Sequence, residues 1–223
     1  MAIKKSKFGG VFLVNSKLAT INLTPGEKVY GEQFVNEGEI EYRIWDVFRS
    51  KPAAAIKKGI KEFPVKEGMK ILYLGIASGT TASHFSDIIG PDGIIYGVDV
   101  AERTLRDLIK HAEKRGNIIT ILADARMPEK YENIVMEKVD LVYADVADPE
   151  EVTLFIRNCG HFLKPKGYGM IAVKSRSIDV IKNPQQIYKE TRKQLQQKFE
   201  ILDFVELDPY DKDHGFFVLR LKK

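Results

Sequence analysis

From residue 70 to residue 173 the chain alternates short apolar runs with segments of helical periodicity, and this alternation restricts the possible fold most strongly. The apolar runs predict strands at residues 70–74, 94–98, 119–122, 140–144 and 169–173. Helix starts near Thr, Glu or Pro predict helices near residues 80–88, 102–115, 149–163 and 184–198. Strands that alternate with helices in this way predict crossover connections and therefore a parallel sheet.

Two more apolar runs, EILDFVEL at 200–207 and GFFVLRL at 215–221, follow with only a short PYDKDH connection between them. Because so short a connection cannot contain a crossover helix, this last pair is predicted to be an antiparallel hairpin. A seven-stranded, mostly parallel sheet that ends in such a hairpin resembles the Rossmann-like α/β fold of S-adenosylmethionine-dependent methyltransferases. In a dehydrogenase of the doubly wound class, the last strand would be expected to run parallel.

The N-terminal part has a different pattern. Between residues 8 and 46, short segments rich in Val, Ile, Phe and Tyr are separated by Gly, Asn and Pro, which is typical of hairpins. We therefore predict a small N-terminal β extension at residues 1–48 and a catalytic domain at residues 49–223.

Composition restricts the function only weakly. The 35 basic and 31 acidic residues give a formal charge of +4, which permits a polyanionic partner without requiring one. The single cysteine, Cys159, excludes an internal disulfide and is expected to be a buried small hydrophobe. The start of the chain does not resemble a signal peptide, and no run of about 18 apolar residues is present, so we expect a soluble intracellular protein without a membrane span.

A turn rich in small residues follows the first strand of the predicted sheet. In KILYLGIASGTT, the strand runs into Gly75, Ala77 and Gly79, and a helix is predicted to begin near Thr80. Small residues allow the backbone to approach a ligand, and the N–H groups of the helix start offer donors to it. The spacing is G-x-A-x-G instead of the dinucleotide fingerprint, which favours S-adenosylmethionine over NAD, although a plain tight turn is the alternative.

Acidic residues stand at the ends of the next two strands. Asp99 ends IIYGVDV, about where an acidic side chain can accept hydrogen bonds from both ribose hydroxyls of a nucleoside, although it could also cap the following helix. Asp124 and Ala125 follow the third strand, where a carboxylate can contact an adenine amino group. Ligands of open α/β sheets bind at these strand ends, so the sequence predicts a nucleoside site there.

Charged residues also end the fourth and fifth strands. Asp145 follows LVYA, and Lys174 follows MIAV. A charge at the end of a buried strand is costly to desolvate unless it is paired or has a function. We predict that Asp145 and Lys174 meet over the reacting methyl group, and the alternative is a salt bridge that closes the sheet edge.

Longer stretches of this sequence resemble fibrillarin, the methyltransferase of box C/D guide-RNA particles. The resemblance covers nearly the whole chain and is carried by FRSKPAAAI, YLGIASGTTASHFSDIIGPDG, ADARMPEKY, VDLVYADVADP, FLKPKG and PYDKDHGFFVL. It implies cofactor contacts at Gly75, Ala77, Thr80, Thr81, Asp99, Val100, Asp124, Ala125, Asp145, Val146, Ala147 and Asp148. The chain departs from the family pattern at Asp99, Val100 and Asp148, where Glu, Phe and Gln are common. The first two departures predict weaker cofactor binding in the same mode, and Asp148 adds negative charge near the sulfonium.

The resemblance implies transfer of a methyl group from S-adenosyl-L-methionine to the 2′-hydroxyl of RNA ribose, in rRNA and tRNA. We expect Lys174 to stabilise the incoming oxygen, and Asp145 to orient either the hydroxyl or the lysine. The resemblance adds Lys51 and His214 to this catalytic set. Lys51 could instead be a solvated or phosphate-contacting lysine, and His214 could simply cap its turn.

The resemblance also implies partners. These are a box C/D guide RNA, the target RNA, a scaffold protein of the Nop family and, through it, a kink-turn-binding ribosomal-type protein. The run KSRSIDVIKNP could form a basic patch for RNA with Arg49, Lys51, Lys57 and Lys58, or could be a solvated face. No Gly/Arg-rich tail is present, which resembles the archaeal form and predicts a cytoplasmic location, with a nucleolar one only for a eukaryotic protein.

His84, His111 and His161 have no partners at metal-ligand spacing, so we expect no metal site. Three other functions are possible. They are a catalytically inactive assembly module of the RNA particle, a small-molecule or protein O-methyltransferase, and an NAD(P)-linked oxidoreductase. The last would need a phosphate-binding glycine turn and a hydride-transfer set, neither of which is seen.

Overall fold

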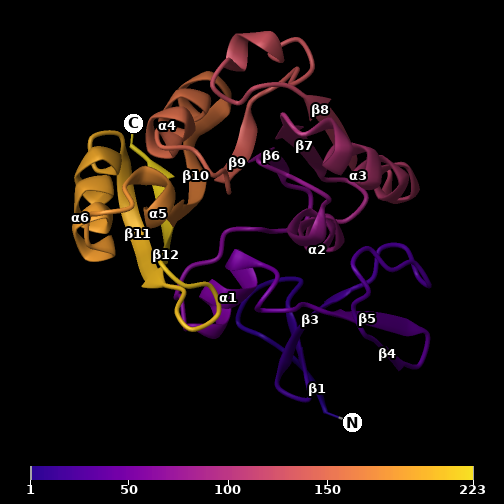
Figure 1. Ribbon diagram of the computed structural model, residues 1–223. Coiled ribbons are helices and arrows are strands. Elements are labelled where there is room, and N and C mark those ends of the chain that lie inside the picture. Colours follow the sequence, from indigo (N-terminus) through magenta and orange to yellow (C-terminus); the bar gives the residue numbers. More distant parts are fainter. Residues whose placement is uncertain (1, 223) are drawn as a thin grey trace.

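The computed structural model describes residues 2–222 and forms two sheets, shown in Figure 1. The larger sheet consists of β6 (Lys70–Leu74), β7 (Ile94–Asp99), β8 (Ile118–Leu122), β9 (Val139–Ala144), β10 (Leu163–Lys174), β11 (Phe199–Glu206) and β12 (His214–Leu221). Their order is β11-β12-β10-β9-β6-β7-β8, and every neighbouring pair is parallel except the two that contain β12. The predicted seven-stranded, mostly parallel sheet with an antiparallel last hairpin is confirmed.

Strand β10 is longer than predicted, because it begins at Leu163 and not at residue 169. The sequence KPKG suggests a turn, but Leu163 pairs with Val139 of β9, and the register shifts before pairing resumes at Tyr168. Lys164 donates to Asp140 at 2.6 Å, which also ties this segment to β9. A bulge therefore keeps the segment in the sheet where composition alone favours a loop.

The four predicted helices are confirmed, with small shifts at their ends. They are α2 (Thr80–Ile89), α3 (Glu102–Arg115), α4 (Glu151–Phe162) and α6 (Pro184–Leu195). Three short helices were not predicted. They are α1 (Lys51–Lys57), α5 (Ser175–Ile178) and the 3-10 helix η1 (Pro128–Lys130). Helix α1 has Pro52 in its first turn and buries three consecutive alanines, residues 53–55. Across residues 2–222, no helix has the length and apolar character needed to cross a membrane.

The central strands are buried on both faces, and successive residues of each strand point into different layers. In β6, Ile71 and Tyr73 pack in the layer of α1, α2 and α3, whereas Leu72 and Leu74 pack in the layer of α4 and α6. This alternation is the period of two expected of a strand, and a helix layer on each face is typical of parallel sheets.

The second sheet is antiparallel and lies near the N-terminus, beside α1 and α2 in Figure 1. Its strands are β1 (Ile3–Lys5), β2 (Phe12–Val14), β3 (Lys17–Ile21), β4 (Phe34–Glu37) and β5 (Ile40–Ile44). The predicted β extension is thus present as a sheet. The predicted boundary between this extension and the catalytic domain, after residue 48, stays a prediction. Residues 1 and 223, the outer ends of the two predicted domains, lie outside the described residues.

Residues 28–33 are strand-like in sequence but irregular in the structure. The Glu32 carboxylate accepts the N–H groups of Val29 and Tyr30, at 3.1 and 2.9 Å, which holds this segment in a turn. Glu32 also binds Arg43 of β5, which is fully buried and donates to Asp87 of α2 at 2.8 Å. A buried ion cluster therefore joins the N-terminal sheet to the larger domain.

Candidate functional site

The turn between β6 and α2 approaches the end of β9 very closely. Gly75 has a φ of +79°, and a Cβ atom added to it would lie 2.3 Å from the Asp145 carbonyl oxygen. Ala77 also has a positive φ, of 49°, and its N–H donates to Asp99 at 2.8 Å. The lack of a Cβ at Gly75 is therefore required for this contact between neighbouring strand ends, and the plain tight turn stays open as the alternative to a ligand-binding turn.

Gly75→Ala should lower the free energy of unfolding by at least about 2 kcal/mol, because the left-handed backbone is strained for Ala and the new methyl group meets a carbonyl oxygen. Gly26→Ala is the matched control, since Gly26 has a similar φ of +85° but open space around the added Cβ. Denaturant unfolding of both variants measures the difference. Equal decreases in the two proteins would contradict the importance of the close approach.

A cavity of about 350 Å³ opens at the carboxyl ends of β6, β7, β8 and β9. It is lined by Gly75, Ala77, Val98, Asp99, Val100, Ala123, Asp124, Ala125, Arg126, Asp145, Val146, Ala147, Asp148 and Leu154. These include every predicted cofactor residue except Thr80 and Thr81. Thr81 is buried and donates to Ser50 at 2.9 Å, so its hydroxyl supports the start of α1 and does not line the cavity.

The Asp99 carboxylate makes two backbone contacts, and its predicted hydrogen bonds to ribose hydroxyls stay a prediction. One carboxylate oxygen accepts the N–H of Ala77, and the other accepts the N–H of Ala101 at 2.9 Å, just before α3. The same side chain thus fixes the glycine turn and the entry to the next helix. Val100 is 67% exposed at the cavity edge, where it offers less apolar area than an aromatic ring would.

Arg126 is a member of the cavity wall that the sequence analysis missed, although it lies two residues after Asp124. Its guanidinium donates to the Asp124 carboxylate, and this hydrogen bond lowers the pKa of Asp124. Arg126 Nη1 also lies 4.0 Å from Asp148 Oδ2. Asp148 stands where the family commonly has Gln, and the negative charge that it adds therefore lies beside the Arg126 guanidinium.

At one side of the cavity, four ionisable residues form a continuous series of contacts. Lys51 Nζ lies 2.8 Å from Asp145 Oδ1 and 3.6 Å from Asp211 Oδ2. His214 Nδ1 lies 3.0 Å from Asp211 Oδ1. We call this series, Asp145–Lys51–Asp211–His214, the charge chain. Asp211 was missed, but it lies in the PYDKDH motif.

The pKa values of Lys51 and Asp211 favour the ionised forms of these two side chains. Burial works against the charge of Lys51, but the carboxylates of Asp145 and Asp211 outweigh it and raise the pKa of Lys51 above its usual value. Burial likewise opposes ionisation of Asp211, yet the contacts of that carboxylate with His214 and Lys51 lower its pKa overall. Lys51 is thus held as a cation between two carboxylates.

Lys174 is placed beyond Asp145 and not against it. Ala144 pairs with Ile171, so Lys174 lies three residues past the last paired position of β10 on that side. The Asp145 carboxylate pairs with Lys51 instead, and no ion pair joins Lys174 to Asp145 among residues 2–222. Across the other edge of β10, Lys174 is in register with His214 of β12, which brings it to the end of the charge chain.

The remaining histidines and Cys159 lie outside this site. His84 is fully buried, with Thr20 Oγ1 2.8 Å from Nδ1 and Tyr30 Oη 2.7 Å from Nε2. Burial lowers the pKa of His84 well below its usual value, so the ring is neutral and structural. Cys159 is buried as expected. Within residues 2–222, no three His, Cys, Asp or Glu side chains are grouped to hold a metal ion.

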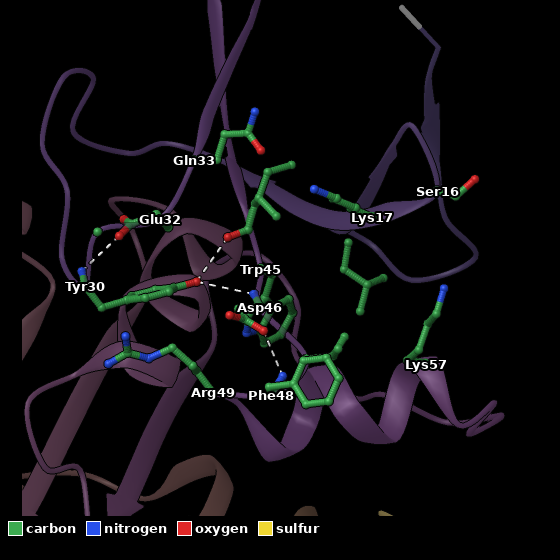
Figure 2. A pocket seen from close by; sticks show the side chains of 14 residues that line it. Ser16, Lys17, Tyr30, Glu32, Gln33, Trp45, Asp46, Phe48, Arg49 and Lys57 are labelled. Carbon is green, nitrogen blue, oxygen red and sulfur yellow. Dashed lines mark hydrogen bonds between the residues drawn. The ribbon is translucent and has the colours of Figure 1, made fainter. Parts of the chain in front are cut away.

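A second cavity, of about 430 Å³, lies between the N-terminal sheet and α1 (Figure 2). Lys17, Arg49 and Lys57 contribute cations to its wall, and Arg49 Cζ lies 5.2 Å from the centre of the Tyr30 ring. Phe48 is 68% exposed there. No predicted cofactor or catalytic residue lines this cavity, but Arg49 and Lys57 belong to the predicted basic patch.

Comparison with known proteins gives a consistent result. The fibrillarin family model matches residues 2–223. A fibrillarin-like rRNA/tRNA 2′-O-methyltransferase of Pyrococcus furiosus is 53% identical over 224 residues, which cover 98% of each chain. The structure of Aeropyrum pernix fibrillarin with natively bound S-adenosyl-L-methionine aligns with a TM-score of 0.91 and 50% identity over 98% of each chain. Fibrillarin from a fibrillarin/Nop5p complex aligns with a TM-score of 0.89 and 39% identity, over 97% of this chain and 100% of that one.

Proposed function

Because the chain belongs to the fibrillarin family, we propose that it transfers a methyl group from S-adenosylmethionine to the 2′-hydroxyl of ribose in rRNA and tRNA. The observation that carries this proposal is the charge chain, which begins at Asp145 in the wall of the strand-end cavity. A nucleoside cavity beside a half-buried cation is suited to reactions at a hydroxyl group, where negative charge develops on oxygen.

The cavity residues fit S-adenosylmethionine. Gly75 lines the cavity without a side chain, and the carboxylates of Asp99 and Asp124 lie at neighbouring strand ends. We assign Asp99 to the ribose, Asp124 and Ala125 to the adenine, and residues 145–148 with Gly75 and Ala77 to the amino-acid end. Thr80 and Thr81 lie outside the cavity wall, and the Thr81 hydroxyl donates to Ser50 at the start of α1.

S-Adenosylmethionine supplies an electrophilic methyl group whose leaving group is a neutral thioether, so no acid is needed there. The protein must align the hydroxyl and stabilise the negative charge that develops on its oxygen. We assign this stabilisation to Lys174 and Lys51, with Asp145 orienting Lys51. Asp211 holds Lys51 from its other side and connects it to His214.

We propose that the chain works as the catalytic subunit of a box C/D particle. The Nop5p complex of its relative supports a Nop-family scaffold as partner, and the rRNA/tRNA names of its relatives support an RNA substrate. A guide RNA and, through the scaffold, a kink-turn-binding ribosomal-type protein complete the proposed particle. The similar proteins come from archaea, so we propose a cytoplasmic location.

The test is an incubation with tritium-labelled S-adenosylmethionine and a target RNA, with and without the guide RNA and scaffold proteins. We expect label at one ribose 2′-oxygen, and only in the complete particle. Label on free nucleosides, catechols or peptides would instead indicate a small-molecule or protein methyltransferase. A complete particle that binds the cofactor but transfers no label would indicate an inactive assembly module.

The second cavity gives a prediction for RNA contact. Because Lys17, Arg49 and Lys57 have no carboxylate partner within ion-pair distance in residues 2–222, replacing all three by Gln should weaken binding to RNA phosphates. We expect the KM for target RNA to rise about tenfold, and the salt dependence to fall by about one unit of slope for each phosphate that the variant no longer neutralises. The maximal rate should change little.

The matched control removes the same charge from exposed positions distant in sequence, at Lys110, Lys130 and Lys189. Each variant is assayed in the reconstituted particle at several salt concentrations. If the control triple variant raises the KM as much as the first one, the effect belongs to overall charge and not to the second cavity.

A further inference from the structure

Glu151, the first residue of α4, is a fully buried acid beside the active site. It differs from Glu32, the other buried glutamate of the described core, which has the Arg43 guanidinium as partner. No cation lies within ion-pair distance of Glu151 among residues 2–222. One of its oxygens, Oε1, accepts the N–H of Lys174 at 3.0 Å, and the other, Oε2, is buried without a hydrogen-bond partner.

The bond to Lys174 replaces a missing strand partner. Ser175 N–H donates to the Asp213 carbonyl on the β12 side, at 3.1 Å, so the preceding N–H, of Lys174, points away from β12. On that other side β9 has already ended at Ala144. The Glu151 carboxyl therefore holds the last residue of β10 at the place where the sheet no longer can.

The surroundings favour a neutral carboxyl group. Asp145 and Asp148 of the β9–α4 connection repel a negative charge there, whereas Lys51 of α1 and the N–H of Lys174 attract it. Burial outweighs these attractions and raises the pKa of Glu151 to about 9. A protonated carboxyl still accepts the Lys174 N–H through its carbonyl oxygen, so the contact does not require the charge.

We propose that Glu151 is a positioning residue that acts as a neutral acid, holding the end of β10 so that Lys174 stays beside His214 and the charge chain. The inference rests on the proposed methyl transfer. Ionisation of Glu151 would add an unpaired negative charge under a site that already contains Asp145 and Asp148. It would thus weaken the stabilisation that the cations give to developing charge on the hydroxyl oxygen.

Two substitutions of Glu151 distinguish its role as a hydrogen-bond acceptor for the Lys174 N–H from its ability to ionise. In the reconstituted particle at neutral pH, Glu151→Ala should lower the single-turnover rate of methyl transfer on the order of tenfold, because Lys174 is no longer held in place. Binding of S-adenosylmethionine should change less than twofold. Glu151→Gln keeps a neutral acceptor of the same shape and should restore the wild-type rate.

The pH profile distinguishes positioning from mere packing. The wild-type rate should decline above about pH 9 as Glu151 loses its proton, and this decline should be absent in Glu151→Gln. Glu150→Gln removes a neighbouring exposed carboxylate and should keep the wild-type profile. A Glu151→Gln rate as low as that of Glu151→Ala, or a Glu151→Ala rate equal to wild type, would overturn the proposal.

A second measurement does not depend on catalysis. The infrared spectrum of the full chain at neutral pH should contain the carbonyl band of a protonated, buried carboxylic acid, and Glu151→Gln should lack it. Absence of the band in the wild type would overturn the neutral acid. If the wild-type particle transfers no methyl group while the band is present, the proposed function fails and the protonation state of Glu151 stands.

Discussion

Lys51→Met should lower the rate of methyl transfer in the assembled particle by about a hundred- to a thousandfold, while S-adenosylmethionine remains bound. The side chain is 22% exposed, and its ammonium group joins Asp145 to Asp211. Removing it eliminates a cation held for the developing charge, and also leaves the Asp145 carboxylate free to repel that charge. Single-turnover kinetics together with cofactor titration measure the two effects separately.

The control for this prediction is Lys66→Met, which removes the same charge from an exposed loop. Lys51→Arg keeps the charge but changes the geometry, and should recover part of the rate. If Lys51→Met transfers the methyl group as fast as the Lys66 variant does, Lys51 is an ordinary surface lysine and the catalytic assignment of the charge chain is wrong.

Arg43→Met should lower the free energy of unfolding by about 3–5 kcal/mol, because it leaves the buried Glu32 carboxylate without a cation and removes one of the two arginines that contact Asp87. Arg43 lies 2.5 Å from Glu32 and 2.8 Å from Asp87, and the side-chain exposure of all three is at most 1%. The remaining cation on Asp87 is Arg115, at 2.7 Å, and it does not contact Glu32. The N-terminal sheet should therefore detach most easily in this variant.

Denaturant unfolding of Arg43→Met is best compared with that of Arg106→Met. Arg106 is 72% exposed in its side chain and pairs with Glu102 on the surface of α3, so its removal should cost less than about 1 kcal/mol. Proteolysis of residues 2–44 in the folded protein provides a second readout of sheet detachment. Similar decreases in stability for the two arginine variants would show that the buried cluster contributes little.

The strand-end half of the site could be predicted from sequence, because it depends on topology. Asp99, Asp124 and Asp145 each follow an apolar run, and the carboxyl ends of parallel strands meet at one edge of the sheet. The position of each residue along its own strand was sufficient, without knowledge of distant contacts. The same periodicity located the main helices.

The contacts within the charge chain could not be predicted from sequence in the same way. Lys51 and Asp145 are 94 positions apart, and nothing local shows that Lys51 would reach Asp145 before Lys174 does. The pairing depends on β10 extending past the end of β9, a difference in strand length that periodicity does not reveal. Likewise, Arg43 and Glu32 look like solvated surface residues in sequence, although they are buried together.

The position of β12 has a consequence for synthesis of the protein. Although β12 follows β11 in the chain, it lies between β10 and β11 in the sheet, and it carries His214 at its start. Until that strand leaves the ribosome, β11 has no neighbour with which to pair and the charge chain lacks its final member. The sheet is therefore completed, and Asp211 gains its contact with His214, only after translation has proceeded past β12.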